Sequence, residues 1–262
     1  MSVGLSTAAF YGLMETEDAA GIMREFGIPV CEVFLQTQSE YRESYGREIR
    51  ERLGPVRCVS VHPKGTQFEN DLTGASPRQR RDGLEIFGHV LDAANAAGAS
   101  FYVMHGIFAV RGRIHPDTNP RVQEYLPEVI SYAKRRGIQV LWENVSWCSM
   151  RDPEDVRTVR RLFPEVGFVL DTKQAAEAGA LLPEMTEAMG DRLRHVHVLD
   201  RDENGKLCLP GEGITDWEGF FRGLKKIGYR GDVILEPYSY LSGDRERLKR
   251  SLRFLEEMER ET

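Results

Sequence analysis

Three carboxylates and one imidazole lie at the downstream ends of short apolar runs in the second half of the chain. They are Glu143 in VLWENV, Asp171 in GFVLDT, His197 in LRHVHVLD and Glu236 in DVILEP. If these runs are the last four strands of a closed parallel barrel, their downstream ends are neighbours on one rim. The sequence therefore predicts that the four side chains gather around one point as a metal site.

The three acids set the chemistry of this predicted site. In a partly dry pocket their negative charges would repel one another unless protons or a cation compensated them. Taken singly, each acid could instead cap a helix, and the histidine could bond within the core. Their coincidence on four successive runs favours one divalent metal ion. Mostly oxygen ligands with one nitrogen favour manganese, magnesium or cobalt, and zinc is also compatible.

Two more histidines end earlier runs, His62 in CVSVHPKG and His105 in FYVMHG. A barrel would direct both across the same opening, where they would contact a substrate hydroxyl or bind a second metal. Trp147, in SWCSM, would either stack on the face of a sugar or pack against the protein. His195 lies two residues before His197, so it should face the same side at greater depth and support the site.

Short β-rich runs recur along the chain, with helical patterns between them. Eight runs are expected to be strands: residues 3–7, 30–35, 56–62, 100–105, 138–144, 166–171, 193–199 and 232–236. Leu84, Phe87 and Leu91 repeat at helical spacing within 77–97. This alternation favours an α/β fold, a single (β/α)8 TIM barrel domain over residues 1–262. An open doubly wound sheet is the alternative, but no glycine-rich nucleotide fingerprint follows the first run.

The composition narrows the classes of partner. The 262 residues are 41% hydrophobic and 29% charged, which is typical of a globular protein, and no apolar stretch has the length of a membrane span. A formal net charge of −6 favours a small carbohydrate over nucleic acid or an anionic membrane. The start, MSVGLSTAAF, lacks the features of a secretory signal, so a cytoplasmic location is expected. A homo-oligomer is compatible with the sequence, which specifies no symmetry.

The chain resembles the sugar phosphate isomerase/epimerase superfamily in the motifs WEN, LDT, HVHVLD, LPGEG followed by DW, and IGYRG with VILEP. Members of this superfamily share a xylose isomerase-like TIM barrel and are related to the ketose 3-epimerases and to endonuclease IV. The resemblance covers nearly the whole chain and is strongest in its second half. In the ketose 3-epimerases, Glu, Asp, His and Glu hold manganese or cobalt. The resemblance therefore implies the same role for Glu143, Asp171, His197 and Glu236.

Two positions depart from the ketose 3-epimerase pattern. Gln174 stands three residues after Asp171, where epimerases and endonucleases often have a histidine, so one sugar contact or metal ligand has changed. Glu203 stands six residues after His197, where the 3-epimerases place an arginine, so the resemblance does not establish ketohexose specificity. An endonuclease activity is not expected, because its three-zinc cluster also needs an Asp-x-His pair that DRDENGK does not supply.

The predicted function is a metal-dependent isomerase or epimerase of a small sugar or sugar derivative. The metal would stabilise the enediolate that forms when a carbon beside the carbonyl loses its proton, and Glu143 and Glu236 would be the catalytic acid and base. Four residues would contact the substrate: His62, His105, Gln174 and Trp147. Proton exchange on opposite faces gives epimerisation, and transfer between adjacent carbons gives isomerisation. Two alternatives stay open: a lyase of the keto-inositol dehydratase type, and a non-catalytic sugar-binding protein.

Overall fold

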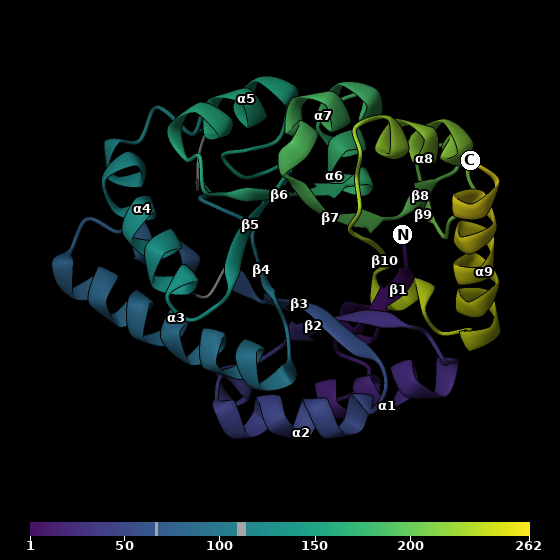
Figure 1. The fold of residues 1–262 in the computed structure, drawn as a ribbon, viewed down its shortest axis with the longest axis horizontal. Helices are drawn as coiled ribbons and strands as arrows, with labels where there is room; N and C mark the ends of the chain where they lie inside the picture. The colour runs from purple at the N-terminus through teal and green to yellow at the C-terminus, as the bar shows by residue number, and fades with distance from the viewer. Residues whose placement is uncertain (66–67, 109–113) are drawn as a thin grey trace.

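The computed structural model describes residues 1–65, 68–108 and 114–262. Eight parallel strands form a closed barrel surrounded by helices (Figure 1). The barrel strands are β1 (Val3–Ser6), β2 (Val30–Leu35), β3 (Arg57–Pro63), β4 (Phe101–Met104), β5 (Gln139–Glu143), β6 (Gly167–Asp171), β7 (Leu193–Val198) and β10 (Asp232–Leu235). Because β1 pairs with both β2 and β10, the barrel closes in the order β1-β10-β7-β6-β5-β4-β3-β2. The predicted (β/α)8 TIM barrel is confirmed.

Helices follow the strands and cover the outside of the barrel. They are α1 (Thr16–Phe26), α2 (Glu43–Leu53), α3 (Pro77–Ala97), α4 (Pro120–Lys134), α5 (Pro153–Leu162), α6 (Thr172–Glu177), α7 (Leu182–Met189), α8 (Trp217–Lys226) and α9 (Arg245–Glu261). In Figure 1 they form an outer ring, with α1 and α2 on one side of the barrel and α5 and α7 on the opposite side. Within the described residues, no helix is both long and apolar enough to cross a membrane.

The eight predicted runs coincide with the eight barrel strands, and the ends differ by at most one residue. The agreement has a physical cause. Barrel strands are covered by helices outside and by neighbouring side chains inside, so both faces are buried and the runs read as nearly continuous apolar stretches. All five residues of β6, for example, are buried.

A small hairpin after β7 was not predicted. It consists of β8 (Asp200–Arg201) and β9 (Leu207–Cys208), which pair in antiparallel orientation. Strands of two residues are too short to show an alternating pattern, so periodicity could not reveal them. The hairpin lies outside the barrel order and leaves the alternation of barrel strands and helices intact.

The inside of the barrel changes character along its axis. Small apolar clusters fill part of it, including Val30, Val59 and Ile234 in one cluster and Val103 in another. Successive residues of a strand alternate between faces, so Glu32, two residues after Val30, also points inward but nearer the carboxyl end. The interior therefore passes from apolar to polar toward the end where active sites of such barrels are built.

Candidate metal and substrate site

The four predicted metal ligands lie together at the carboxyl end of the barrel. Glu143 ends β5, Asp171 ends β6, His197 is the penultimate residue of β7 and Glu236 directly follows β10. One ligand atom from each lies within 4.8 Å of the others. All four residues are buried, with exposures between 1% and 8%. Their role as metal ligands stays a prediction, while their proximity is a property of the fold.

The imidazole of His197 has different partners at its two nitrogens. Nδ1 lies 2.9 Å from Oε1 of Glu143 and 3.3 Å from Oε2 of Glu236. Nε2 lies 3.0 Å from Oε2 of Glu32. Because Glu32 accepts a hydrogen bond from Nε2–H, Nδ1 is the nitrogen that faces the other two acids and that could bind a metal once it has lost its proton.

Sequence reasoning missed Glu32, which lies in the middle of β2. Its carboxylate is 0% exposed, and Oε2 accepts a hydrogen bond from Oγ of Ser60 at 2.7 Å. The same oxygen lies 3.2 Å from Nε2 of His195, which supports the cluster from below as expected. The signal that could have revealed Glu32 is an acid inside the apolar run VCEVFL, because a buried carboxylate needs partners.

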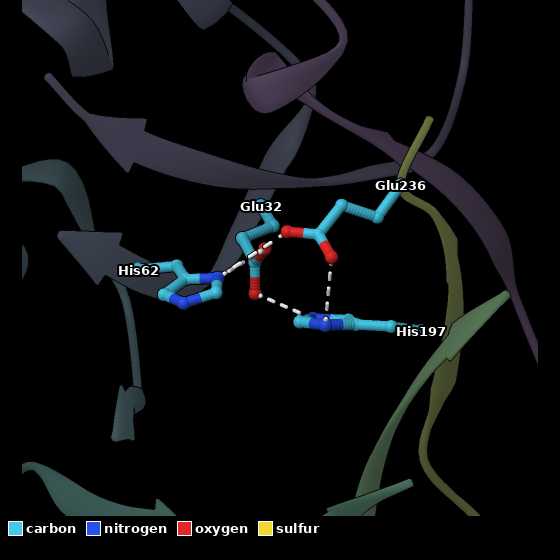
Figure 2. Close-up of side chains that lie close together, drawn as sticks. All are labelled: Glu32, His62, His197 and Glu236. Atoms are coloured by element: carbon cyan, nitrogen blue, oxygen red, sulfur yellow. Dashed lines mark hydrogen bonds and ion pairs between the residues drawn. The ribbon is translucent and has the colours of Figure 1, made fainter. Parts of the chain in front are cut away.

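Figure 2 shows a closed ring of alternating carboxylates and imidazoles formed by Glu32, His197, Glu236 and His62. His62 completes the ring through Nδ1, which lies 3.3 Å from Oε1 of Glu236 and 3.5 Å from Oε1 of Glu32. The ring couples the predicted substrate contact His62 to two predicted metal ligands. A change in charge at one member of the ring therefore shifts the pKa values of its neighbours.

His105 joins the cluster through His62, because their Nε2 atoms lie 3.0 Å apart. On its other side, Nδ1 of His105 lies 3.5 Å from Oε2 of Glu69, which also accepts the backbone N–H of His105 at 3.1 Å. Sequence reasoning missed Glu69, which lies in a short 3-10 segment, Glu69–Thr73, with no strand-end position to mark it. His62, His105 and Glu143 also have ligand atoms within 4.8 Å of one another. Substrate contact or a second metal at this place stays a prediction.

Asp171 is held by the first turn of α6. Its Oδ1 caps the helix by accepting the backbone N–H of Gln174 at 2.8 Å. Its Oδ2 lies 3.6 Å from Nζ of Lys173. Gln174 is fixed in turn, because its Oε1 accepts the backbone N–H and the hydroxyl of Ser146 at 2.9 and 2.8 Å. The β6–α6 junction therefore positions three polar side chains at one edge of the cluster.

A cavity of about 250 Å³ opens onto the cluster. Its lining includes six of the predicted residues: His62, His105, Glu143, Trp147, Gln174 and Glu236. Trp147 is 48% exposed, and its ring centre lies 5.9 Å from that of His105. The predicted catalytic acids and all four predicted substrate contacts thus face one space, which is the arrangement expected of a substrate pocket.

The imidazole of His197 controls the charge of the two nearest acids. Burial alone would raise the pKa of Glu236, but the charge of His197 and the hydrogen bond from it hold that pKa well below its usual value. Burial would also raise the pKa of Glu143, but the hydrogen bond from His197 and the charges of His197 and His62 together lower it. Both carboxylates are therefore ionised at neutral pH.

Two other groups are shifted toward the protonated form. Burial would lower the pKa of His62, but hydrogen bonds to two carboxylates raise it to about 10. Burial raises the pKa of Asp171 to about 7, against the opposing positive charge of Lys173. In the absence of metal, protons thus supply part of the positive charge that the acids require.

The donor set fits a divalent cation. Three carboxylates and one imidazole offer hard oxygen ligands with one nitrogen, and they are close enough to share an ion. Metal binding requires deprotonated ligands, so an ion would replace the protons on His197 and Asp171. The replacement would neutralise the acids without leaving an unpaired charge in the buried pocket.

Comparisons with known proteins agree with the barrel. A family model described as the xylose isomerase-like TIM barrel matches residues 22–258. L-ribulose-5-phosphate 3-epimerase UlaE from Escherichia coli is 24% identical over 202 residues, which cover 72% of this chain and 66% of that protein. The chain therefore spans just under two thirds of the length of this relative.

Two solved structures superpose closely on this chain. D-Psicose 3-epimerase with D-tagatose, from Clostridium cellulolyticum H10, has a TM-score of 0.79 at 17% identity, over 100% of this chain and 99% of that one. The IOLI protein with a binding zinc atom has a TM-score of 0.76 at 15% identity, over 98% and 96% of the two chains. At these identities the similarity shows the shared barrel fold.

Proposed function

This chain belongs to the xylose isomerase-like TIM barrel family, and from that membership and the geometry of the cluster we propose that it is a metal-dependent sugar epimerase or isomerase. One observation carries the proposal. Glu143 and Glu236 come from different strands, line the same cavity, and both contact Nδ1 of His197. Two acids placed around one candidate metal position are what proton exchange at a carbon beside a carbonyl requires.

The proposed metal ligands are Glu143, Asp171, His197 and Glu236. When bound, a divalent ion would supply Lewis acidity to the carbonyl and hydroxyl oxygens of a hydroxyketone. The oxygen-rich ligand set favours manganese, magnesium or cobalt, and zinc is also compatible. Glu32 would hold the ring of His197 through Nε2, so that Nδ1 stays directed at the other ligands.

Glu143 and Glu236 would move the substrate proton. In the barrel order, β5 and β10 are separated by β6 and β7, so the two carboxylates reach the cavity from different directions. Both are ionised and able to accept a proton, because their pKa values are lowered. One acid would remove the proton from one face of the carbon and the other would return it from the opposite face, which inverts the configuration. This arrangement favours epimerisation, and the relative named above is a 3-epimerase.

The substrate would be a small carbohydrate bound by His62, His105, Gln174 and Trp147. His62 and His105 present ring nitrogens at the wall of the cavity, where they can bond to sugar hydroxyls. Trp147 has an exposed ring at the mouth, and the face of a sugar can stack on such a ring. The apolar ring and the polar nitrogens together match the two kinds of surface that a sugar presents.

The test is solvent-deuterium exchange into a panel of ketoses and sugar derivatives, with the metal-free protein and after addition of manganese, magnesium, cobalt or zinc. We expect deuterium at a carbon beside the carbonyl, formation of the epimer, and both only with metal. Exchange that is independent of metal would contradict the proposal. Release of water with a new enone absorbance would indicate a lyase instead, and binding without exchange would indicate a sugar-binding protein.

A further inference from the structure

Lys173 places a buried ammonium group in the cavity. Its side chain is 7% exposed, and the residue lines the same cavity as Glu143 and Glu236. Nζ lies 3.6 Å from Oδ2 of Asp171 and 4.5 Å from the ring centre of Tyr238. The distance to Asp171 is that of an ion pair rather than a hydrogen bond, and the hydroxyl of Tyr238 is a hydrogen-bond partner of the ammonium, which leaves further N–H donors of Lys173 unused. A buried ammonium with three N–H donors is costly to leave without an acceptor.

The amide of Gln174 presents a second unused donor beside Lys173. Its Oε1 accepts the backbone N–H of Ser146, which can only donate, so the orientation of the amide is fixed by this contact. The hydroxyl of Ser146 donates to the same oxygen. Nε2, which carries two N–H donors, therefore points elsewhere and forms no hydrogen bond with a described residue. Gln174 also lines the cavity and is buried.

The second lysine near the mouth behaves differently. Nζ of Lys64 donates to the hydroxyl of Tyr11 at 2.9 Å, so its charge already has a hydrogen-bonded partner. Asp171 can balance part of the charge of Lys173, but its Oδ2 lies beyond hydrogen-bonding distance from Nζ. Lys173 and Gln174 thus present adjacent N–H donors to the cavity that these contacts do not use, and one of the two groups is charged. An acceptor-only group with negative charge satisfies both, and a carboxylate is such a group.

We propose that Lys173 and Gln174 bind a carboxylate of the substrate, next to its reacting hydroxyketone unit. The substrate class is then a keto sugar acid rather than a neutral sugar. This inference rests on the proposed function, since it names the substrate of the same site. The position of the carboxylate follows from Asp171: Nζ lies 3.6 Å from a proposed metal ligand, so the bound anion lies beside the reacting carbons. A phosphate at the far end of a sugar chain would lie too far from them.

The test uses two small ligands that differ at one carbon. Pyruvate carries a carboxylate beside its ketone, and hydroxyacetone carries a hydroxymethyl group there, so neither depends on sugar stereochemistry. Their affinities are measured by calorimetry on the full chain, with and without saturating manganese. We expect the wild-type protein to prefer pyruvate. In Lys173→Met, pyruvate binding should weaken roughly 10- to 100-fold, because a charged hydrogen bond is lost, while hydroxyacetone binding is unchanged.

Two further variants separate a specific contact from a general charge effect. Gln174→Ala should weaken pyruvate binding about 2- to 10-fold, as expected for a neutral hydrogen bond. Lys225→Met removes the same charge from α8, where Nζ of Lys225 donates to the backbone oxygen of Glu259 on the surface. It should leave both ligand affinities unchanged. An equal loss of pyruvate binding in Lys225→Met would contradict the proposal.

Other outcomes also decide the question. If the wild-type protein does not prefer pyruvate, or if the preference persists in Lys173→Met, the proposal is wrong. Dihydroxyacetone phosphate serves as the phosphate arm, and tighter binding of this ester than of pyruvate through Lys173 would overturn the carboxylate assignment.

Metal affinity is measured on Lys173→Met to separate this inference from the proposed function. Removing a cation beside Asp171 should leave metal binding intact or strengthen it. A wild-type protein that binds no metal would defeat the proposed function. The pyruvate preference, measured without metal as well, would still decide the role of Lys173.

Discussion

At the amino-terminal end of the barrel, Nη2 of Arg57 donates to both carboxylate oxygens of Asp232, at 3.0 and 2.9 Å, and the arginine side chain is 54% exposed. At the carboxyl end, Glu143, Asp171 and Glu236 lie buried within reach of one another. At the amino-terminal end, the carboxylate of Asp232 is therefore neutralised by an arginine that is itself partly hydrated. The acids at the second end face other acids, so they need protons or a metal to be tolerated.

The larger of the cavities at the two ends is not the one over the candidate site. The cavity lined by Arg57 and Asp232 has a volume of about 420 Å³, and the cavity over the candidate site has about 250 Å³. The larger space is lined by an ion pair whose arginine is 54% exposed, and the smaller one contains several buried acids and histidines that shift one another's pKa values. The cluster of perturbed ionisable groups, rather than the size of the cavity, is therefore what points to the proposed site.

The largest effect is expected for Glu236→Gln at the carboxyl end. Glutamine keeps the shape but removes the charge and the ability to accept a proton, so deuterium exchange should fall by a factor of roughly 10² to 10⁴. Metal affinity should fall moderately, because three proposed ligands remain. Exchange rates and calorimetric metal titrations measure the two effects. A loss of stability with normal exchange would make Glu236 a structural residue only.

A smaller effect is expected for Glu32→Gln, which acts through His197. The glutamine can turn an N–H toward Nε2 of His197, which disfavours the tautomer that leaves Nδ1 free. Metal affinity should fall roughly 10- to 100-fold, as for other residues that orient a metal-binding histidine. Without metal, the charge of Glu32 helps to keep His197 protonated against the effect of burial, so the ¹⁵N shifts of the imidazole, titrated against pH, would report the fall in its pKa. Unchanged shifts together with unchanged affinity would exclude this positioning role.

The pH dependence of metal binding should report the shifted pKa of Asp171 at the carboxyl end. Burial raises the pKa of Asp171 to about 7, so below this pH the ion must displace a proton from that carboxyl. Each displaced proton weakens binding by up to about tenfold per pH unit, so affinity should fall more steeply below pH 7 than above it. Titrations in buffers with different ionisation enthalpies count the released protons. An affinity that does not change between pH 6 and 8 would argue against Asp171 as a ligand.

The smallest effect is expected at the amino-terminal end. Arg57→Met removes the partner of both carboxylate oxygens of Asp232, whose side chain is 11% exposed, so the free energy of unfolding should fall by about 1–3 kcal/mol. Metal affinity and deuterium exchange should equal those of the unchanged protein. Urea denaturation and the same exchange assay measure both. A large loss of exchange would mean that the two ends of the barrel are coupled, and the contrast between them would then fail.

The sequence alone was sufficient to predict the barrel and the end of it at which the candidate site residues gather. Eight buried parallel strands must be apolar on both faces, so each was visible as a short continuous run. A residue at the end of such a run is placed on the rim by the topology, whatever the loops do. For this reason the sequence by itself predicts that Glu143, Asp171, His197 and Glu236 lie together.

The tertiary structure decided how deep each side chain lies in the barrel and which side chains it contacts. Glu32 lies in the middle of a strand, and only the stagger of the closed barrel brings its carboxylate beneath Nε2 of His197. Glu69 reaches His105 from a short segment outside the strands, and Lys173 lines the cavity only because α6 turns it inward. Periodicity along a chain reports which side of an element is buried. Distances between side chains from different elements depend on packing, which no local pattern contains.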